Sequence, residues 1–184
     1  NGWTYISDML YDDLGNLWMT NSYAINSILK CYDNQGVWHS LDLGSSTKTA
    51  HTSRMVQDYN GNIWISMIGR GMVGFNYNKT LDDVSDDKVK IFNTGENTGA
   101  LPANNVTALA VDFDNEIWVG TESGFGILYN SAGAFDASPG EYNIQRIKLE
   151  FEGNVEFLLG STYISSIVVD GGNRKWIGTG GSGI

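Results

Sequence analysis

The chain has 184 residues and a mass of 20.2 kDa, enough for one domain with a substantial core. Its formal net charge is −10, with 11 basic and 21 acidic residues, and the basic residues are scattered along the sequence. Nucleic acids and anionic lipid surfaces both require clustered Lys and Arg, so the charge disfavours both partners. The longest apolar runs, such as 164–169, are far shorter than the roughly 18 residues of a spanning helix, so we expect no direct membrane span.

Cys31 is the only cysteine, which excludes an internal disulfide and a cysteine-based metal cluster. The first residues contain no charged segment followed by an apolar one, so no targeting signal is recognisable there. The chain starts close to a predicted strand, and its last residues fall inside a sequence repeat. We therefore expect it to be a fragment of a longer protein.

One sequence pattern recurs four times, in the segments 11–20 (YDDLGNLWMT), 57–66 (QDYNGNIWIS), 111–120 (VDFDNEIWVG) and 169–178 (VDGGNRKWIG). In each copy an aspartate precedes a tryptophan by six residues, and the pairs are Asp12 and Trp18, Asp58 and Trp64, Asp112 and Trp118, and Asp170 and Trp176. The tryptophans are 46, 54 and 58 residues apart. A four-stranded propeller blade takes roughly 40–50 residues, so the longer intervals predict loop insertions.

Each copy predicts four antiparallel strands. An apolar run before the aspartate, such as 106–111 or 164–169, predicts an inner strand, and a turn rich in Asp, Gly and Asn leads to the strand that carries the tryptophan. A third strand is predicted at 71–78 and 124–130, and a more polar fourth strand at 37–41, 89–93 and 144–151. The segments 80–88 and 131–141 are predicted to be surface loops, and helices are expected to be few.

These elements predict an all-β fold, a β-propeller fragment of about three and a half four-stranded antiparallel blades from a larger, seven-bladed ring. Residues 1–184 then form one partial propeller, with blades at approximately 1–47, 48–100 and 101–160 and a half blade at 161–184. An arc of this size cannot close, and its free edges expose unpaired backbone groups. We expect further blades of the parent protein to complete the ring.

The recurring aspartates and tryptophans are interpreted as structural. Each indole buries on the order of 200 Å² and suits wedge packing between adjacent blades. Each aspartate is expected to accept hydrogen bonds from turn amides. Recurrence in every copy indicates a role in folding, because a ligand or catalytic site needs its residues only once.

No group of residues has the pattern of a catalytic, cofactor-binding or metal site. Hydrolysis needs paired carboxylates, or a nucleophile with an oriented base, and the two histidines, His39 and His51, lie in no recognisable motif. His39 falls in a predicted outer strand and is expected to be solvated. The aspartates at 82, 83, 86 and 87 lack the Gly and Glu of an EF-hand loop, so a solvated loop is favoured over a Ca²⁺ site. We predict that the chain is not an enzyme and has no cofactor.

The candidate ligand-binding residues lie in loops. In propellers, ligands usually bind the face formed by the loops that enter the inner strands and the loops between second and third strands. The candidates in these loops are Tyr23, Arg70, Asn104, Asn105, Glu122, Ser123 and Tyr163.

Two resemblances follow from the motifs. The run 104–121 (NNVTALAVDFDNEIWVGT) resembles the hallmark of the two-component regulator propeller repeats of Bacteroidota. Residues 126–176 are similar to the PorZ-type proteins of the type IX secretion system, in the segments Gly126–Asn130, Gln145–Ile147, Glu152-Gly153, Leu158-Leu159 and Asp170–Trp176.

The PorZ-type resemblance implies an extracytoplasmic protein that is associated with the outer membrane at the cell surface. It implies a non-enzymatic scaffold in the attachment complex of type IX secretion, with other secretion-complex proteins and lipopolysaccharide or another surface glycan as partners. The alternative is a periplasmic, glycan-sensing propeller of a hybrid two-component histidine kinase. A third possibility is an enzyme, such as a polysaccharide lyase or a glycosidase, whose active residues lie on other blades.

Overall fold

The computed structural model describes residues 5–181 and contains only β-strands and two short 3-10 turns in that range, Ser45–Thr47 (η1) and Gly133–Phe135 (η2). The first sheet has the order β1 (Ile6–Tyr11), β2 (Leu17–Asn21), β3 (Leu29–Tyr32) and β4 (Trp38–Leu41). The second has the order β5 (Thr52–Gln57), β6 (Ile63–Met67), β7 (Gly71–Asn76) and β8 (Lys88–Phe92). The third contains β9 (Val106–Val111), β10 (Ile117–Thr121) and β11 (Gly124–Leu128), and the fourth contains β14 (Ile164–Val169) and β15 (Lys175–Thr179).

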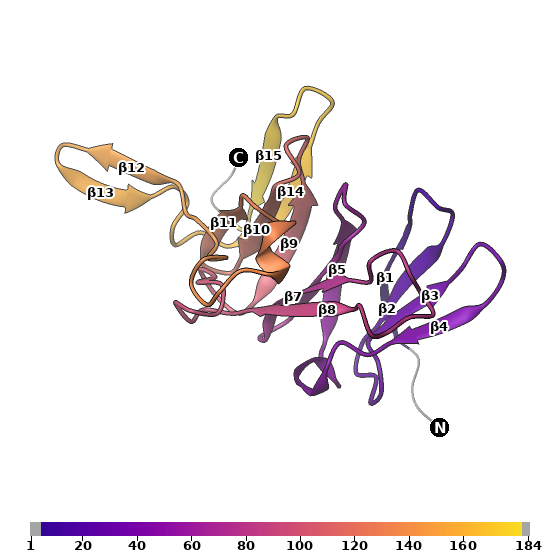
Figure 1. Ribbon diagram of the computed structural model, residues 1–184. Coiled ribbons are helices and arrows are strands. Elements are labelled where there is room, and N and C mark those ends of the chain that lie inside the picture. Colours follow the sequence, from indigo (N-terminus) through magenta and orange to yellow (C-terminus); the bar gives the residue numbers. More distant parts are fainter. Residues whose placement is uncertain (1–4, 182–184) are drawn as a thin grey trace.

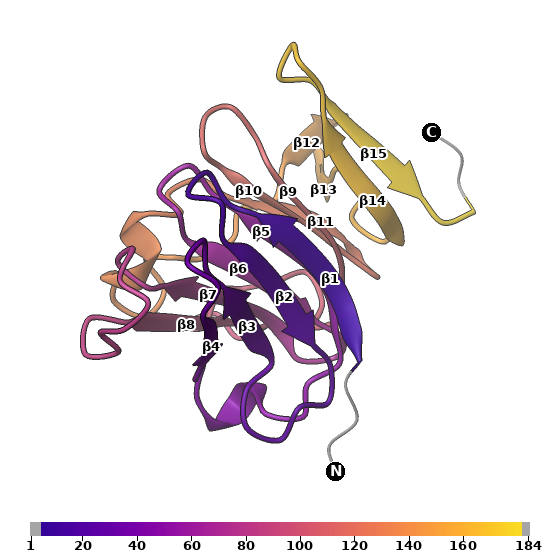
Figure 2. The same ribbon diagram turned by 90° about the vertical axis from the view of Figure 1, so that its right-hand side faces the viewer.

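All strand pairs in these sheets are antiparallel, and the sheets stand side by side as separate layers (Figure 1). The first strand of each sheet is the inner one: β1 packs against β5, β5 against β9, and β9 against β14 (Figures 1 and 2). Each inner strand pairs with its neighbour through one register shift near its start. The all-β propeller-fragment fold expected from the repeats is therefore confirmed.

One predicted strand is wrong in detail. The segment 144–151 was expected to be the outer strand of the third sheet, but only Gln145 forms a bridge there, to Ile127. Residues Lys148–Phe151 (β12) instead pair with Asn154–Phe157 (β13) in a hairpin that projects away from the stacked sheets (Figure 1). The two-residue turn between them, Glu152 and Gly153, has φ values of 49° and 78°. Such a turn matches the twist of a hairpin, so these residues pair locally rather than with β11.

The core consists of apolar layers between adjacent sheets. Trp18 of the first sheet is fully buried, and its ring centroid lies 4.9 Å from that of Tyr77, which directly follows β7 of the second sheet. Trp64 is equally buried and packs with Met72, Leu109 and Val119 in the layer between the second and third sheets. Aromatic and aliphatic side chains from facing sheets thus fill each layer.

The other two tryptophans differ in burial. Trp118 is 9% exposed and stacks on Phe125, with centroids 5.6 Å apart, in the layer between the third and fourth sheets. Trp176 is 56% exposed, because no sheet among residues 5–181 covers the outer side of β14 and β15. Three of the four indoles are therefore buried between sheets, and the fourth is half exposed.

A carboxylate organises the turn that precedes each tryptophan. In the second sheet, Asp58 Oδ1 accepts the backbone amides of Asn60 and Asn62 at 2.9 Å. Its Oδ2 accepts Asn62 Nδ2 at 2.9 Å and Trp64 Nε1 at 3.0 Å. Asp12, Asp112 and Asp170 hold their own turns and indoles by the same bonds. One side chain thereby fixes both the hairpin turn and the orientation of the ring that fills the core.

The third copy of this arrangement is modified. Glu116 occupies the position of Asn62, and burial and the neighbouring Asp112 carboxylate raise its pKa. Lys175 of β15 approaches Asp112 Oδ2 at 2.9 Å and lies over the Trp118 ring. Burial of Asp112 favours its neutral form, but the bonds from Lys175, the Glu116 amide and the Trp118 indole outweigh it and lower the pKa of Asp112. Lys175 of the fourth sheet thus compensates for the additional negative charge that Glu116 brings to the third sheet.

The same turns also join neighbouring sheets. The third residue after each aspartate has a positive φ, and it is Gly15, Gly61, Asn115 or Asn173. Where it is asparagine, its Oδ1 accepts an amide from the preceding sheet: Asn115 from Tyr59 at 2.7 Å, and Asn173 from Phe113 at 3.0 Å. The first and second sheets lack this bond because Gly61 has no side chain.

Replacing Asp58 by alanine removes an acceptor shared by four hydrogen bonds. We expect Asp58→Ala to lower the free energy of unfolding by about 3 kcal/mol, because buried donors are left unpaired. Asp170→Ala is the matched control: it breaks the same bonds beside the half-exposed Trp176, where water can replace them, so its loss should be smaller. Urea unfolding followed by tryptophan fluorescence measures both. Equal losses would contradict this account of the buried carboxylate.

Gly61→Asn should strengthen the contact between the first and second sheets. Asparagine tolerates a positive φ, and its side chain would meet the amide of Asp13, as Asn115 meets that of Tyr59. We expect the free energy of unfolding to rise by about 0.5–1 kcal/mol in thermal or urea denaturation. Gly61→Ala supplies the control: it has no acceptor and a strained backbone, so it should destabilise. A Gly61→Asn variant no more stable than Gly61→Ala would disprove the proposed bond.

Candidate functional site

The loop face carries a continuous chain of backbone hydrogen bonds. Within each sheet, the amide after the second strand donates to the residue just before the inner strand, in the pairs Ser22 to Tyr5, Ile68 to His51, Glu122 to Asn105 and Gly180 to Tyr163. Between sheets, the same loops donate to the next segment, in the pairs Tyr23 to Ala50, Gly71 to Asn104 and Gly124 to Thr162. These bonds of 2.8–3.2 Å hold the loops of all four sheets along one rim.

All seven candidate residues from the sequence lie on this rim or in its loops, but they do not converge on one point. Asn105 Nδ2 donates to Glu122 Oε2 at 2.9 Å, and the Ser123 amide donates to Thr121. Asn104 Oδ1 accepts the amide of Thr94. The last three candidates, Tyr23, Arg70 and Tyr163, are exposed in loops of different sheets.

The candidates include only one member of an aromatic cluster on the rim. Tyr23 stacks on His51 with centroids 5.0 Å apart and an interplanar angle of 25°. Tyr5 packs edge-on against both rings, 6.2 Å from Tyr23 and 6.4 Å from His51. The sequence offered one signal for this cluster, since Tyr5 and His51 each immediately precede an inner strand.

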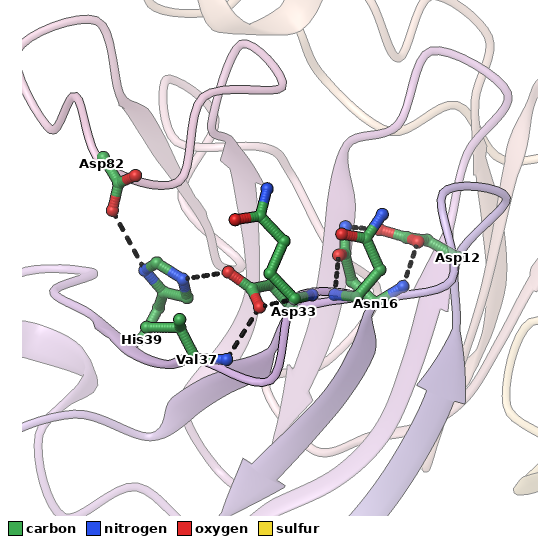
Figure 3. A network of polar contacts seen from close by, with 8 residues as sticks. Asp12, Asn16, Asp33, Val37, His39 and Asp82 are labelled. Carbon is green, nitrogen blue, oxygen red and sulfur yellow. Dashed lines mark hydrogen bonds and ion pairs between the residues drawn. The ribbon is translucent and has the colours of Figure 1, made fainter.

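A groove at the opposite end of the first two sheets contains a polar network (Figure 3). Asp12 Oδ2 accepts Asn16 Nδ2, and Asn16 Oδ1 accepts the amide of Asn34 at 3.0 Å, which joins the two turns of the first sheet. The open groove beside them has a volume of about 550 Å³. It lies between the β3–β4 turn and the loop after β7, and Asp33, Lys79, Asp82 and Asp83 are among its lining residues.

The sequence analysis expected His39 to be solvated, and this prediction is wrong: its side chain is only 10% exposed. Its Nε2 lies 2.9 Å from Asp33 Oδ2, and its Nδ1 lies 3.6 Å from Asp82 Oδ1, on the loop from the second sheet (Figure 3). The hydrogen bond with His39 and the amide of Val37 lower the pKa of Asp33. Strand β4 sits under this loop, which explains why a position in an outer strand is covered.

The aspartates of the loop 80–88 do not point to one centre. Asp86 accepts hydrogen bonds from Asn78 and Thr80, and Asp83 accepts them from Ser85. Between residues 5 and 181, no group of three or more His, Cys, Asp and Glu side chains is arranged to hold a metal ion.

Two further observations concern reactivity and membranes. Burial, with the Asp12 and Asp33 carboxylates nearby, raises the pKa of the Cys31 thiol to about 12, so it is protonated and poorly nucleophilic at neutral pH.

In the part of the chain that the structure describes, no helix has the length and apolar character needed to cross a membrane.

The bond between His39 and Asp33 predicts a pH effect. Because the pKa of Asp33 is lower in the folded chain than in the unfolded one, its carboxylate stabilises the fold at neutral pH, and this contribution is lost as the pH falls through the folded pKa. Carboxyl ¹³C NMR should give Asp33 a pKa below that of an ordinary aspartate, and His39→Gln should raise it. Asp83 serves as the internal control: hydrogen bonds from Ser85, not from His39, lower its pKa, so the pKa of Asp83 should not change in His39→Gln. An unchanged Asp33 pKa in His39→Gln would refute this assignment.

Comparisons with known proteins agree with the propeller geometry. The two component regulator propeller family matches residues 100–123, which include β9 and β10. A search of curated protein sequences finds no match. Among solved structures, the chain is similar to PorZ of Porphyromonas gingivalis, described as an essential bacterial surface component of the type-IX secretion system, with 27% identity and a TM-score of 0.80. The alignment covers 97% of this chain and 25% of that chain.

Two more distant structures share the fold. The extracellular domain of a protein from B. thetaiotaomicron described as a hybrid two component system has 20% identity and a TM-score of 0.64, over 95% of this chain and 20% of that chain. Virginiamycin B lyase from Staphylococcus aureus has 14% identity and a TM-score of 0.61, over 95% of this chain and 48% of that chain. The chain thus spans about a quarter of the length of PorZ and less than half of the length of each of the other two proteins. It shares with all three a stack of antiparallel propeller sheets.

Proposed function

We propose that this chain is part of a non-enzymatic binding propeller at the cell surface, in the attachment complex of the type IX secretion system. The observation that carries the proposal is the similarity to PorZ, with 27% identity along 97% of the chain. Three motifs outside the propeller strands support it further: Gln145–Ile147 precedes β12, Glu152-Gly153 forms the turn of the projecting hairpin β12–β13, and Leu158-Leu159 follows β13. Its partners are then other secretion-complex proteins, and lipopolysaccharide or another surface glycan.

The arrangement of side chains supports binding rather than catalysis. His39 lies between two aspartates, and the Cys31 thiol is protonated. The rim instead offers polar side chains and exposed aromatic rings on loops that hydrogen bonds hold in place. Such a surface suits recognition of an extended partner.

A glycan-sensing propeller of a hybrid two-component system is the second candidate. The match of residues 100–123 to the two component regulator propeller family favours it. The similarity to the extracellular domain from B. thetaiotaomicron, at 20% identity, supports only a common fold. The sensor would be periplasmic and linked to a kinase through a membrane helix.

The two candidates predict different partners. We expect the affinity-tagged parent protein, cross-linked in its native bacterium, to co-purify with type IX secretion components, which mass spectrometry identifies. Deletion of residues 5–181 should block surface anchoring of secreted cargo, and re-expression of the intact gene should restore it. An untagged strain controls for background. A parent protein that carries a kinase domain, and whose deletion changes only glycan-induced transcription, would favour the sensor instead.

A further inference from the structure

We propose that Tyr5, Tyr23 and His51 form a stacking site for a neutral saccharide on the rim between the first two sheets. The inference rests on the proposed binding function and specifies one ligand class and the residues that contact it. Three rings from three separate segments meet here: one before β1, one after β2, and one before β5. The site therefore depends on both sheets being in place.

The cluster is open to solvent. Tyr5 is 55% exposed and Tyr23 is 54% exposed, whereas Trp18 and Trp64 are fully buried between sheets. His51 supports Tyr23 from one side by parallel stacking at 5.0 Å, and the edge of Tyr5 meets both rings. No residue between 5 and 181 forms a hydrogen bond with either phenol oxygen. The two tyrosines thus present ring surface and free hydroxyl groups together.

The backbone holds Tyr23 in an unfavourable conformation. Its φ is 61°, and among the described non-glycine residues with positive φ it is the only aromatic one. A bulky residue in this region costs of order 1 kcal/mol and persists only where surrounding bonds impose it. Here the Tyr23 amide donates to Ala50 O at 2.8 Å, and the Thr49 amide donates to Ala24 O at 2.9 Å. These bonds hold an exposed ring at a fixed position on the rim.

The chemistry of the cluster favours a saccharide. One face of a pyranose ring is a patch of C–H groups that packs on an aromatic ring, and its hydroxyls can bond to phenol oxygens at the edge. Stacking of this kind needs no charge on the ligand. The cluster consists of two phenols and an imidazole and has no carboxylate or guanidinium group, so it favours a neutral hexose chain over an acidic one.

The other rim positions provide a comparison within the chain. Asn105 and Tyr163 occupy the same place as Tyr5 and His51 in the third and fourth sheets. Asn105 bonds to Glu122, and Tyr163 lies against Gly180 and contacts no other aromatic ring among residues 5–181. Tyr163→Ala is therefore a matched control, because it removes an exposed rim tyrosine that belongs to no cluster.

The test is a titration of the 184-residue chain with maltohexaose, cellohexaose and mannohexaose, followed by aromatic ¹H–¹³C NMR. We expect at least one of them to shift the ring signals of Tyr5 and Tyr23 and to leave those of Tyr163 unchanged. Tyr23→Ala and Tyr5→Ala should each weaken that binding about 10-fold, a typical effect of losing one aromatic contact. Tyr23→Phe should retain most of the affinity because the ring remains, and Tyr163→Ala should retain all of it.

Each outcome bears on one proposal only. If none of the three sugars shifts the Tyr5 and Tyr23 signals, or if Tyr23→Ala and Tyr5→Ala bind as tightly as the original chain, the saccharide site is refuted. Co-purification with type IX components would then still support the binding propeller. If a sugar binds at Tyr23 but no secretion component co-purifies, the site stands and the secretion role fails. Unchanged chemical shifts of the buried Trp64 indole verify that each variant is folded.

Discussion

The hydrogen bond from a tryptophan indole to an aspartate six residues earlier is the interaction on which the rest of the structure depends. The carboxylate satisfies the amides of a tight turn, which would otherwise be unpaired, and it also fixes the indole that fills the layer between sheets. Local turn geometry and long-range packing are therefore set by one side chain. Where the indole is half exposed, at Trp176, the Trp176 indole and the Arg174 amide still lower the pKa of Asp170 to about 2.

The repeats are stable as a stack because contacts between sheets occur at three levels. Apolar layers fill the middle, backbone hydrogen bonds join the loops on the rim, and side chains of the turns join the opposite end. Each level varies from copy to copy. Lys175 compensates for Glu116 in the third copy, and Gly61 leaves a bond unmade between the first two sheets. Variation is tolerated because each copy has several independent contacts with its neighbour.

The features that distinguish this chain from a plain repeat lie at the ends of the strands. The rim places Tyr5, Tyr23 and His51 together, and the opposite end holds His39 between two aspartates from different sheets. The hairpin β12–β13 extends a third surface away from the stack. In a propeller, strands supply rigidity and connecting loops carry the residues used in recognition, so these three places are the candidate binding surfaces.

The sequence alone determined the repeat, the strand order and the inner strands, because apolar alternation, turn residues and a six-residue Asp–Trp spacing are local signals. It also located the rim loops, since Tyr23 and Tyr163 follow directly from the strand pattern. Only the tertiary structure decided which side chains meet. The Tyr5–His51 contact spans two sheets, the cover over His39 comes from a loop more than forty residues away, and the segment 148–157 pairs with itself because its turn has the geometry of a hairpin. The first two contacts depend on the stacking of whole sheets, which no local pattern encodes, whereas the hairpin is a local pairing.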